Sequence, residues 1–332
     1  MSDERKTVED VAKAAGVSLM TVSRAINGRP GVSETTRRTI LEIADRMGYR
    51  PNRMARGLAS RNTSTFGIVF PDMANPFFAI LAKAATDMAR LSNLAVFVMN
   101  TDEDPSLELA AYDSLIEERI NGVIVSGSRL PRAKLLQAVS RFNAAALVNS
   151  DVHGDRIVNI DVDDQAGVFA AVSYLISSGR KHIGFIAGPK ESCSGRRRLA
   201  GFKAALQEHG MAFDVGAMER CVPNMAGGTA AIAALLERRP KLDAVVAYND
   251  ITAIGVLRGL ADSGRSVPAD LSIIGVDDIP YAALVRPALS TLRIDIPTLG
   301  GEAMRALIDL RDGKPAPVFS PLKLELVLRA SA

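Results

Sequence analysis

Side chains suited to holding a ligand, polar ones and one phenylalanine, follow four hydrophobic segments that have the length of a buried strand. They are Asn75 and Phe78 after 66–70, Ser194 and Arg198 after 182–187, Asn249 after 244–248, and Asp277 after 271–276. Carboxylates and amides exchange hydrogen bonds with hydroxyls, a guanidinium supplies a rigid fork of donors, and a phenyl ring offers an apolar face. This combination predicts a pocket that binds and orients a small hydroxylated molecule.

The reactive groups that an enzyme needs do not converge in this sequence. There is no glycine-rich phosphate loop, no nucleophile elbow, no pair of histidines at metal-binding helical spacing and no CxxC. The three histidines, His153, His182 and His209, are scattered along the chain. We therefore expect no catalytic residue, no bound metal and no cofactor.

Three charged residues of the same region have structural alternatives to ligand binding. Asp164 forms an acidic cluster with Asp161 and Asp163, but we interpret it as a cap for the helix predicted from residue 165 rather than as a metal ligand. We interpret Asp250 in the same way, as a cap. For Arg198 the alternative is a salt bridge to a nearby carboxylate.

Further positive charge is expected near the mouth of the pocket. Lys190, Arg196 and Arg197 precede or accompany Arg198. They would suit a sugar acid or a sugar phosphate. Solvated arginines on a helix face explain them as well, and we favour that interpretation.

Residues 8–27 predict a different chemistry, the reading of DNA. Their apolar residues have the spacing of two short helices that cross at a tight turn, with Gly16 ending the first and Ser18 capping the second. Arg24 on the second helix can bond both acceptors of a guanine, a contact worth about 1–3 kcal/mol of discrimination. An amphipathic helical hairpin with a solvent-facing arginine is the alternative.

Other side chains of the second helix complete this predicted DNA-reading surface. Leu19 and Met20 can make apolar contacts, for instance to thymine methyl groups. Thr21 and Ser23 are better suited to phosphates. Ser33 would cap a third helix, and the segment 50–61 after it is too short to be a stable helix alone.

The distribution of charge agrees with a nucleic-acid partner for the amino-terminal segment alone. The chain has 332 residues, of which 48% are hydrophobic and 23% charged, and its formal net charge is +3. Residues 1–61 contain twelve Lys and Arg against seven Asp and Glu, which gives +5 and leaves −2 for the remainder. A basic head on a slightly acidic body is typical of a protein that binds a polyanion through its head.

No apolar run approaches the roughly 18 residues that a membrane span needs, and the charged opening Met-Ser-Asp-Glu-Arg-Lys is unlike a signal peptide. We therefore expect a cytoplasmic protein with no membrane partner. Cys193 and Cys221 lack a metal-ligand spacing and are expected to be free thiols.

The rest of the chain alternates between strand and helix patterns, which is typical of parallel βαβ units. A first series has strands at 66–70, 95–99, 123–125 and 145–148, with helices at 76–91, 107–118 and 132–142. A second series has strands at 182–187, 219–222, 244–248 and 271–276, with helices at 165–178, 197–209, 228–238 and 251–263. The last residues read as strand 289–294, helix 297–311 and strand 322–328.

Several motifs resemble the LacI/GalR family of bacterial transcriptional repressors. They are Thr7-Val-Glu-Asp-Val-Ala, Gly16-Val-Ser, Thr21-Val-Ser-Arg-Ala-Ile-Asn27, Tyr49-Arg-Pro-Asn-Arg53 and Ala55-Arg-Gly-Leu-Ala59. The resemblance implies a hinge helix that folds on operator DNA, with Leu58 inserted into the minor groove. Ordinary packing of Leu58 between paired hinges is the alternative. The expected DNA contacts are Thr7, Ser18, Leu19, Met20, Thr21, Ser23, Arg24, Asn27, Asn52, Ala55 and Leu58.

The resemblance also implies the fold and the effector site. We expect an all-α helix-turn-helix head at 1–50, a hinge helix and linker at 51–64, and an α/β body of the periplasmic-binding-protein type with two parallel-sheet subdomains. These would be 65–160 with 293–320, and 161–292 with 321–332. Arg198, Asn249 and Asp277 match the family's effector-binding residues, and Asn75, Phe78, Asn149 and Ser194 are secondary candidates.

Two departures from the family limit these expectations. Val222-Pro-Asn224-Met225 stands where many relatives have an aromatic that stacks on the ligand ring, and the chain has no Trp. No leucine-heptad tail follows the last predicted strand, so we expect a homodimer on a near-palindromic operator rather than a tetramer.

The function predicted from the sequence is that of a DNA-binding transcriptional regulator, expected to be a repressor. A small molecule bound between the subdomains, a sugar, sugar acid or sugar phosphate, would control its affinity for the operator. A solute-binding protein of the same body fold is the first alternative. An α/β enzyme with an incidental helical arm is the second.

Overall fold

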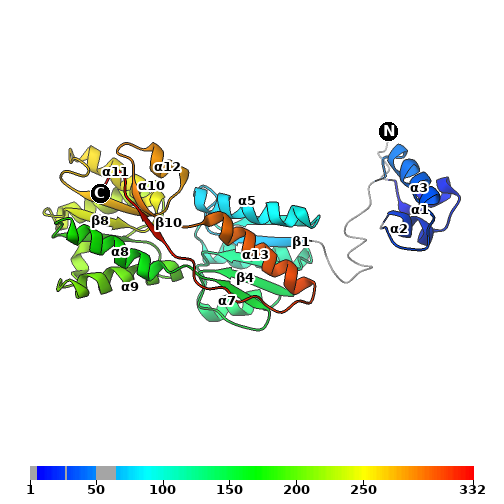
Figure 1. The fold of residues 1–332 in the computed structure, drawn as a ribbon, viewed down its shortest axis with the longest axis horizontal. Coiled ribbons are helices and arrows are strands. Elements are labelled where there is room, and N and C mark those ends of the chain that lie inside the picture. Colours follow the sequence, from blue (N-terminus) through cyan, green and yellow to red (C-terminus); the bar gives the residue numbers. More distant parts are fainter. Residues whose placement is uncertain (1–5, 27, 50–64) are drawn as a thin grey trace. The chain divides into compact units, whose positions relative to one another are not determined.

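The computed structural model describes residues 6–26, 28–49 and 65–332. The chain divides into two compact units, Met1–Ser64 and Thr65–Ala332, which we call the head and the body. The ribbon in Figure 1 shows the helical head and, in the body, two α/β halves, each built on its own sheet. The predicted fold class is confirmed by this architecture.

Residues 6–26 and 28–49 of the head form a bundle of three helices, α1 (Val8–Ala15), α2 (Leu19–Ile26) and α3 (Glu34–Arg46). Gly16 adopts φ +65 at the end of α1, a left-handed conformation that glycine reaches without strain and that turns the chain sharply into α2. The core of the bundle consists of small and branched apolar side chains from all three helices, Val11, Ala12, Val22, Ala25, Ile40 and Ala44.

The first half of the body is built on a five-stranded parallel sheet with the order β2-β1-β3-β4-β5. Its strands are β1 (Thr65–Phe70), β2 (Ala95–Asn100), β3 (Gly122–Ser126), β4 (Ala144–Val148) and β5 (Ile157–Ile160). Helices α5 (Pro76–Leu91), α6 (Pro105–Glu117), α7 (Arg132–Val139) and α13 (Ile296–Arg311) cover it. Separate apolar clusters on the two faces of the sheet form its core.

The second half has a six-stranded sheet with the order β11-β10-β9-β8-β6-β7, in which only β11 is antiparallel to its neighbour. The strands are β6 (Ile183–Ala187), β7 (Met218–Arg220), β8 (Ala244–Ala247), β9 (Ser272–Asp277), β10 (Ser290–Arg293) and β11 (Glu325–Val327). Its helices are α8 (Asp164–Ser177), α9 (Cys193–Glu208), α10 (Met225–Arg238), α11 (Asp250–Asp262) and α12 (Pro280–Leu284), and a short 3-10 turn η1 (Val215–Ala217) precedes β7.

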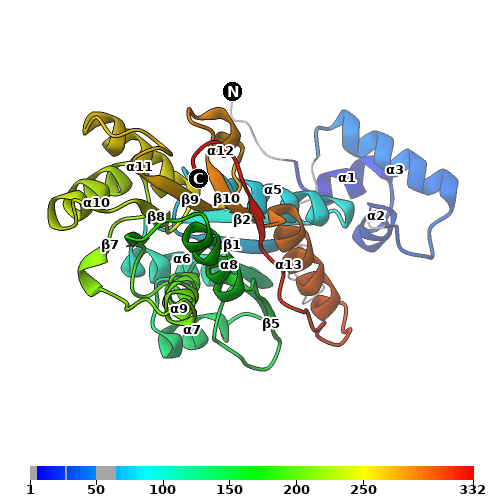
Figure 2. The same cartoon turned by 60° about the vertical axis from the view of Figure 1, so that its left-hand side comes forward.

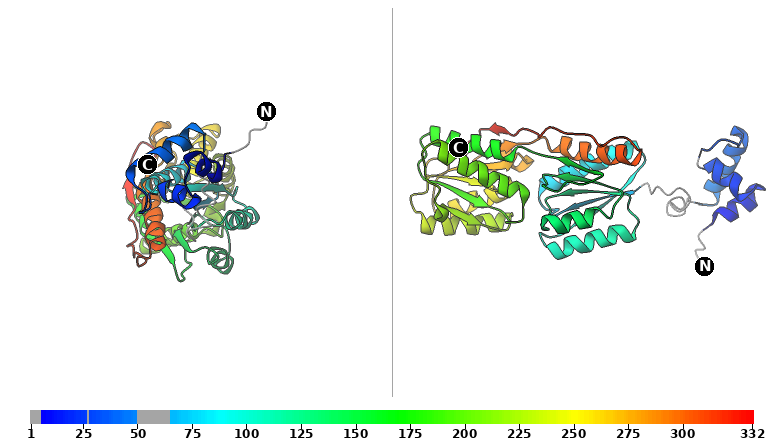
Figure 3. Two further views of the ribbon diagram at one scale, coloured as in Figure 1. Left: turned by 90° about the vertical axis from the view of Figure 1, so that its right-hand side faces the viewer. Right: turned by 90° about the horizontal axis from the view of Figure 1, so that it is seen from below.

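The chain passes between the two halves three times. It leaves the first half after β5, returns after β10 to form α13 against α5, and crosses again to form β11 (Figures 2 and 3). The first and third crossings pair with each other, because Leu322 N donates to Asp161 O at 2.8 Å and Asp163 N donates to Leu322 O at 2.9 Å. These crossings join the halves by backbone hydrogen bonds.

Close helix pairs in the body depend on glycines at their contact points. A Cβ atom built on Gly201 of α9 would lie 2.2 Å from the backbone oxygen of Gln165 in α8. A Cβ atom on Gly300 of α13 would likewise lie 2.2 Å from the oxygen of Leu81 in α5. Both helix pairs therefore pack backbone to backbone, and this fixes the loops that precede α5, α8 and α9 at the carboxyl ends of the strands.

Candidate functional site

A cavity of about 400 Å³ lies between the two halves of the body, a volume within the usual range for small-molecule sites. All seven residues that we expected to bind an effector line it: Asn75, Phe78, Asn149, Ser194, Arg198, Asn249 and Asp277. They follow β1, β4, β6, β8 and β9. The carboxyl ends of strands from both sheets thus face one space, where α/β sheets commonly bind ligands.

Two of the cavity asparagines are helix caps. Asn75 Oδ1 accepts from Phe77 N at 3.0 Å at the start of α5, and Asn249 Oδ1 accepts from Thr252 N at 2.9 Å at the start of α11. Each cap uses the amide oxygen. The amide N–H groups have no protein acceptor within the described residues, so they can donate to a ligand hydroxyl.

Asn149 and Asp277 are held in backbone conformations that non-glycine residues seldom adopt. Asn149 has φ 54 and Asp277 has φ 116. Such positions persist where the surrounding structure over-determines them, and they concentrate at binding sites. Asn149 makes three bonds that fix it: Nδ2 donates to Asp164 Oδ2 at 3.0 Å and to Ser194 Oγ at 3.1 Å, and Oδ1 accepts from Val162 N at 2.6 Å.

Arg198 is the charged centre of the second-half wall. Its Nε lies 2.7 Å from Asp164 Oδ1, and its Nη2 lies 3.5 Å from Asp277 Oδ1. Its Nη1 donates to the backbone oxygen of Tyr248 at 2.5 Å, and the guanidinium lies 5.2 Å from the centre of the Tyr248 ring. Our alternative for Arg198, a salt bridge, is therefore present, and the same side chain also lines the cavity.

Two buried carboxylates share this one guanidinium. Burial raises the pKa of Asp277 to about 7, against the opposing effect of the Arg198 charge, and the neighbouring Asp164 raises it further. Burial also raises the pKa of Asp164, although Arg198 lowers it. The group of three carries a formal charge of −1 when both acids are ionised, and both acids are almost inaccessible to water.

The structure corrects two of our predicted helix caps. Asp163, not Asp164, caps α8, with its Oδ1 accepting from Ala166 N at 3.1 Å, whereas Asp164 is fully buried against Arg198. Asn249, not Asp250, caps α11. Asp250 is instead buried, accepts from Ile279 N at 2.9 Å and from Thr291 Oγ1 at 2.6 Å, and has its pKa raised by burial and by nearby Asp277.

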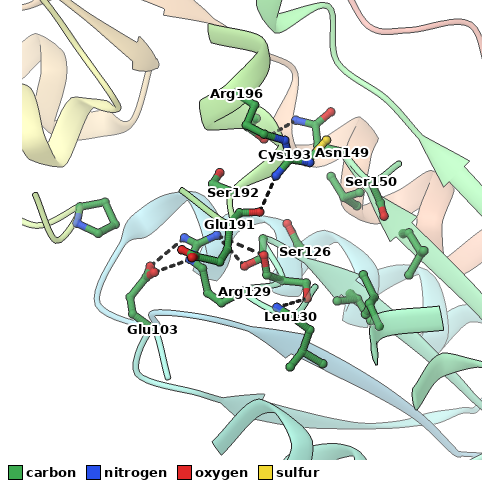
Figure 4. Close-up of a pocket in the computed structure, with 18 of the residues that line it drawn as sticks. Glu103, Ser126, Arg129, Leu130, Asn149, Ser150, Glu191, Ser192, Cys193 and Arg196 are labelled. Atoms are coloured by element: carbon green, nitrogen blue, oxygen red, sulfur yellow. Dashed lines mark hydrogen bonds and ion pairs between the residues drawn. The ribbon is translucent and has the colours of Figure 1, made fainter. Parts of the chain in front are cut away.

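The sequence interpretation missed an ion pair on the first-half wall. Arg129, directly after β3, places Nε 2.5 Å from Glu103 Oε2 and Nη2 3.0 Å from Oε1. Figure 4 shows this pair on one side of the cavity, with Ser192, the N-cap residue of α9, near it. Ser192 Oγ lies 2.8 Å from the Tyr248 hydroxyl. Glu103 and Arg129 each follow a strand, and Ser192 begins a helix, at the same sheet edges as the residues that we predicted. This position at the ends of strands is the signal that could have identified them.

Arg196 and Arg197, at the start of α9, are both ion-paired, although the Arg196 side chain stays 54% exposed. Arg196 Nη2 lies 2.8 Å from Asp151 Oδ2, and Arg197 bonds Asp161 at 2.8 Å and Asp151 at 3.1 Å. Our favoured interpretation, solvated arginines on a helix face, fits the exposed Arg196, whereas Arg197 is 27% exposed and lies between two acids. Cys193 also lines the cavity; burial and a hydrogen bond to Asp151 raise the pKa of its thiol to about 12, so it is a poor nucleophile.

In the head, α2 exposes the side chains that we expected to face DNA. Leu19 and Met20 are 46% and 64% exposed, and Ser23 and Arg24 are also at the surface. Ser18 Oγ accepts from Thr21 N at 3.1 Å, which caps the helix as predicted. Thr7 caps α1 in a reciprocal pair with Asp10. The remaining expected contacts, Asn27, Asn52, Ala55 and Leu58, lie outside the described residues.

Comparison with known proteins gives the family. Residues 7–52 match the model for bacterial regulatory proteins of the lacI family, and residues 172–332 match a periplasmic binding protein-like domain. Catabolite control protein A of Priestia megaterium is 34% identical over 302 residues, which are 91% of each chain. The chain belongs to the lacI family of bacterial regulatory proteins. GalR of Escherichia coli K12 is also 34% identical, over 95% of this chain and 93% of that one.

Solved structures agree with the lacI family assignment. A Lac repressor dimer bound to operator and the anti-inducer ONPF has a TM-score of 0.87 and 26% identity, with 99% of both chains covered. A complex of the regulator CelR with cellobiose has a TM-score of 0.73 and 28% identity, covering 99% of this chain and 100% of that one. The protein is a DNA-binding transcriptional regulator and not an enzyme. Among the described residues, no helix is long and apolar enough to cross a membrane.

Proposed function

We propose that this regulator binds a near-palindromic operator through α2 of each head and the hinge segment. Arg24 would read a guanine, with Leu19 and Met20 on neighbouring base edges and Thr21 and Ser23 on phosphates. The exposure of these side chains on one short capped helix supports the proposal. We also propose the domain boundaries given above: a head at 1–50, a hinge and linker at 51–64, and two subdomains, 65–160 with 293–320 and 161–292 with 321–332.

The small-molecule effector is proposed to bind in the cavity of the body. A single observation carries this proposal: seven residues chosen from the sequence alone line one cavity of about 400 Å³. Their amides, carboxylate and guanidinium suit a sugar or sugar derivative. In support, the regulator CelR was solved with cellobiose and the Lac repressor with ONPG.

A homodimer is proposed from apolar surface that a monomer would expose to water. β2 is the edge strand of its sheet, yet Phe97 and Val98 on it are 45% and 37% exposed. In the second half, Tyr281 and Leu284 on α12 are 51% and 68% exposed. Exposed edge strands invite pairing and apolar patches mark interfaces, so we propose that a second copy covers both surfaces.

Control of DNA binding is proposed to be thermodynamic. The effector can change operator affinity only by binding one arrangement of the two halves more tightly than another. A dimer would transmit that change to the paired hinges. The regulator would act in the cytoplasm, where its operator lies.

A fluorescence anisotropy titration of the full chain tests the proposed function. A labelled palindromic duplex from the protein's own promoter region should bind more tightly than a scrambled duplex at two salt concentrations, since purely electrostatic binding would not discriminate. Asp277→Ala should keep this preference and lose the response to any sugar that changes wild-type binding. Asp262→Ala, at a side chain that is 67% exposed, is the matched control and should keep both. Equal affinity for palindrome and scrambled duplex in every condition would refute the proposal.

A further inference from the structure

Both buried arginines of the cavity wall are already matched by acids of the protein. Arg129, whose side chain is 4% exposed, directs Nε and Nη2 to Glu103 and Nη1 to the backbone oxygen of Gly127 at 2.8 Å. Arg198 directs Nε to Asp164 and Nη2 to Asp277, as described above. Neither guanidinium therefore presents an unmatched positive charge to the cavity.

The backbone conformation at Glu103 determines where its carboxylate points. Asp102 and Glu103, the second and third residues after the Asn100 end of β2, have φ 47 and φ 61. Two consecutive left-handed residues without glycine are unfavourable and must be held by other contacts. Glu103 N donates to Pro71 O at 3.0 Å, and Asp102 Oδ1 accepts from Asn100 Nδ2 at 2.5 Å. The strained turn aims the Glu103 carboxylate at Arg129.

The charges that line the cavity cancel. Five cationic and five acidic side chains line it: Arg129, Arg132, Lys190, Arg196 and Arg198 against Asp72, Glu103, Asp151, Glu191 and Asp277. Two of these five cations, Arg132 and Lys190, have no ion pair among the described residues, and both are exposed at the surface. Asp164 adds a further negative charge behind Arg198. The deep part of the wall is therefore neutral or negative.

We propose that the cavity selects an uncharged, polyhydroxylated ligand, and that Glu103 excludes sugar acids and sugar phosphates by neutralising Arg129. This inference rests on the proposed function and narrows its ligand class. An anion that reaches the deep wall of the cavity loses its hydration and finds no unmatched cation there to replace it, because the two unpaired cations, Arg132 and Lys190, are exposed to solvent. A hydroxyl meets a different surface, because the amide N–H groups of Asn75 and Asn249 remain available. Ser126 at the end of β3 and Ser150 after β4 add hydroxyls to the first-half wall of the cavity (Figure 4).

The first test uses inorganic phosphate as the probe and thermal denaturation of the full chain as the readout, with sodium chloride keeping the ionic strength constant. Glu103→Gln frees the charge of Arg129 while conserving the shape of residue 103. We expect the variant to bind phosphate at least tenfold more tightly than the wild type. The double variant Glu103→Gln with Arg129→Gln, an uncharged pair of similar shape, should return to the wild-type response. A wild type that binds phosphate as tightly as Glu103→Gln would overturn the inference.

The single variant Arg129→Gln keeps the inference testable if the Glu103 variant does not fold. If Arg129 is neutralised in the native protein, its loss should leave the phosphate affinity unchanged within about twofold. A tenfold loss would mean that Arg129 already serves as an anion site, which contradicts the inference. Circular dichroism of each variant confirms folding before titration.

The second test is a panel of matched triplets, each an aldose, its aldonic acid and its phosphate ester. In the wild type the aldose should be the tightest member of any triplet that binds, and Glu103→Gln should move the ratio of acid to aldose affinity by at least tenfold. An acid or phosphate that binds best to the wild type refutes the inference and leaves the proposed function intact. If the protein prefers the palindromic duplex and no compound of the panel changes that preference, the result counts against the proposed effector site. The phosphate titration still decides the role of Glu103 in that case.

Discussion

Replacing Asp277 with asparagine tests whether two buried carboxylates share one guanidinium in the cavity wall. The folded-state pKa of Asp277 is about 7 and its ordinary value is 3.8. Between these values the folded protein holds a proton that the unfolded chain has released. The contribution of Asp277 to stability is therefore greatest at low pH, and it declines as the pH rises from about 4 to 7.

The magnitude follows from proton linkage. One pKa unit corresponds to about 1.4 kcal/mol, so between pH 5 and pH 7 a group with these two pKa values costs the folded state about 2 kcal/mol. Asp277→Asn keeps the shape of the side chain and cannot titrate. The free energy of unfolding of the wild type should therefore fall by about 2 kcal/mol more than that of the variant over this interval, and above pH 7 the variant should be at least as stable.

Urea unfolding followed by far-ultraviolet circular dichroism at pH 5, 6, 7 and 8 measures this difference. Other titrating groups are common to both proteins and largely cancel in the comparison; the exception is Asp250, whose pKa Asp277 raises, and its loss of that effect changes the difference in the same direction. Asp262→Asn, at an exposed carboxylate of α11, is the control and should follow the wild type. Parallel pH profiles for wild type and Asp277→Asn would show that the acid is ionised throughout, and that the shared guanidinium does not govern this site.

Four further substitutions test other parts of the molecule. Arg24→Ala should relax operator specificity at one base pair per half-site, by about 1–3 kcal/mol in a competition binding assay. Leu58→Ala should weaken operator binding and leave effector binding unchanged in calorimetry, whereas loss of both would indicate misfolding. Phe97→Glu should yield monomers in sedimentation velocity and reduce operator affinity. Gly201→Ala should lower the free energy of unfolding by about 1–3 kcal/mol, because its new methyl group meets the Gln165 backbone.

The fold was predictable because its long elements carry strong periodicity. Strands such as β3 and β4 are buried at every position, and α5 has its apolar residues at helical spacing. The elements that the sequence interpretation lacked are short. β5 has four residues with alternating burial and α12 has five, and so few residues carry too little periodic signal to separate from a loop.

The candidate site was predictable in part, and the reasons differ by residue. Asn249 and Asp277 follow strongly hydrophobic strands, so their place at the sheet edge could be inferred. Asp163 and Asp164 are equally good caps by residue type, and only the tertiary position of Arg198 decides which of them is buried. Glu103 and Arg129 are 26 residues apart in the sequence. The left-handed turn that brings the acid to the arginine contains no glycine, so no local motif predicts it.

We propose that Asn149 links ligand binding to the arrangement of the two halves. It follows β4 in the first half, and its amide nitrogen bonds Asp164 and Ser194, which belong to α8 and α9 in the second half. A ligand hydroxyl that accepts from this amide must compete with one of those bonds. Binding at the cavity and contact between the halves therefore draw on the same donor, so a change in one shifts the equilibrium of the other. Asn149→Ala should therefore weaken ligand binding by the loss of one donor, and at saturating ligand it should also remove most of the change in operator affinity that the wild type shows in an anisotropy titration.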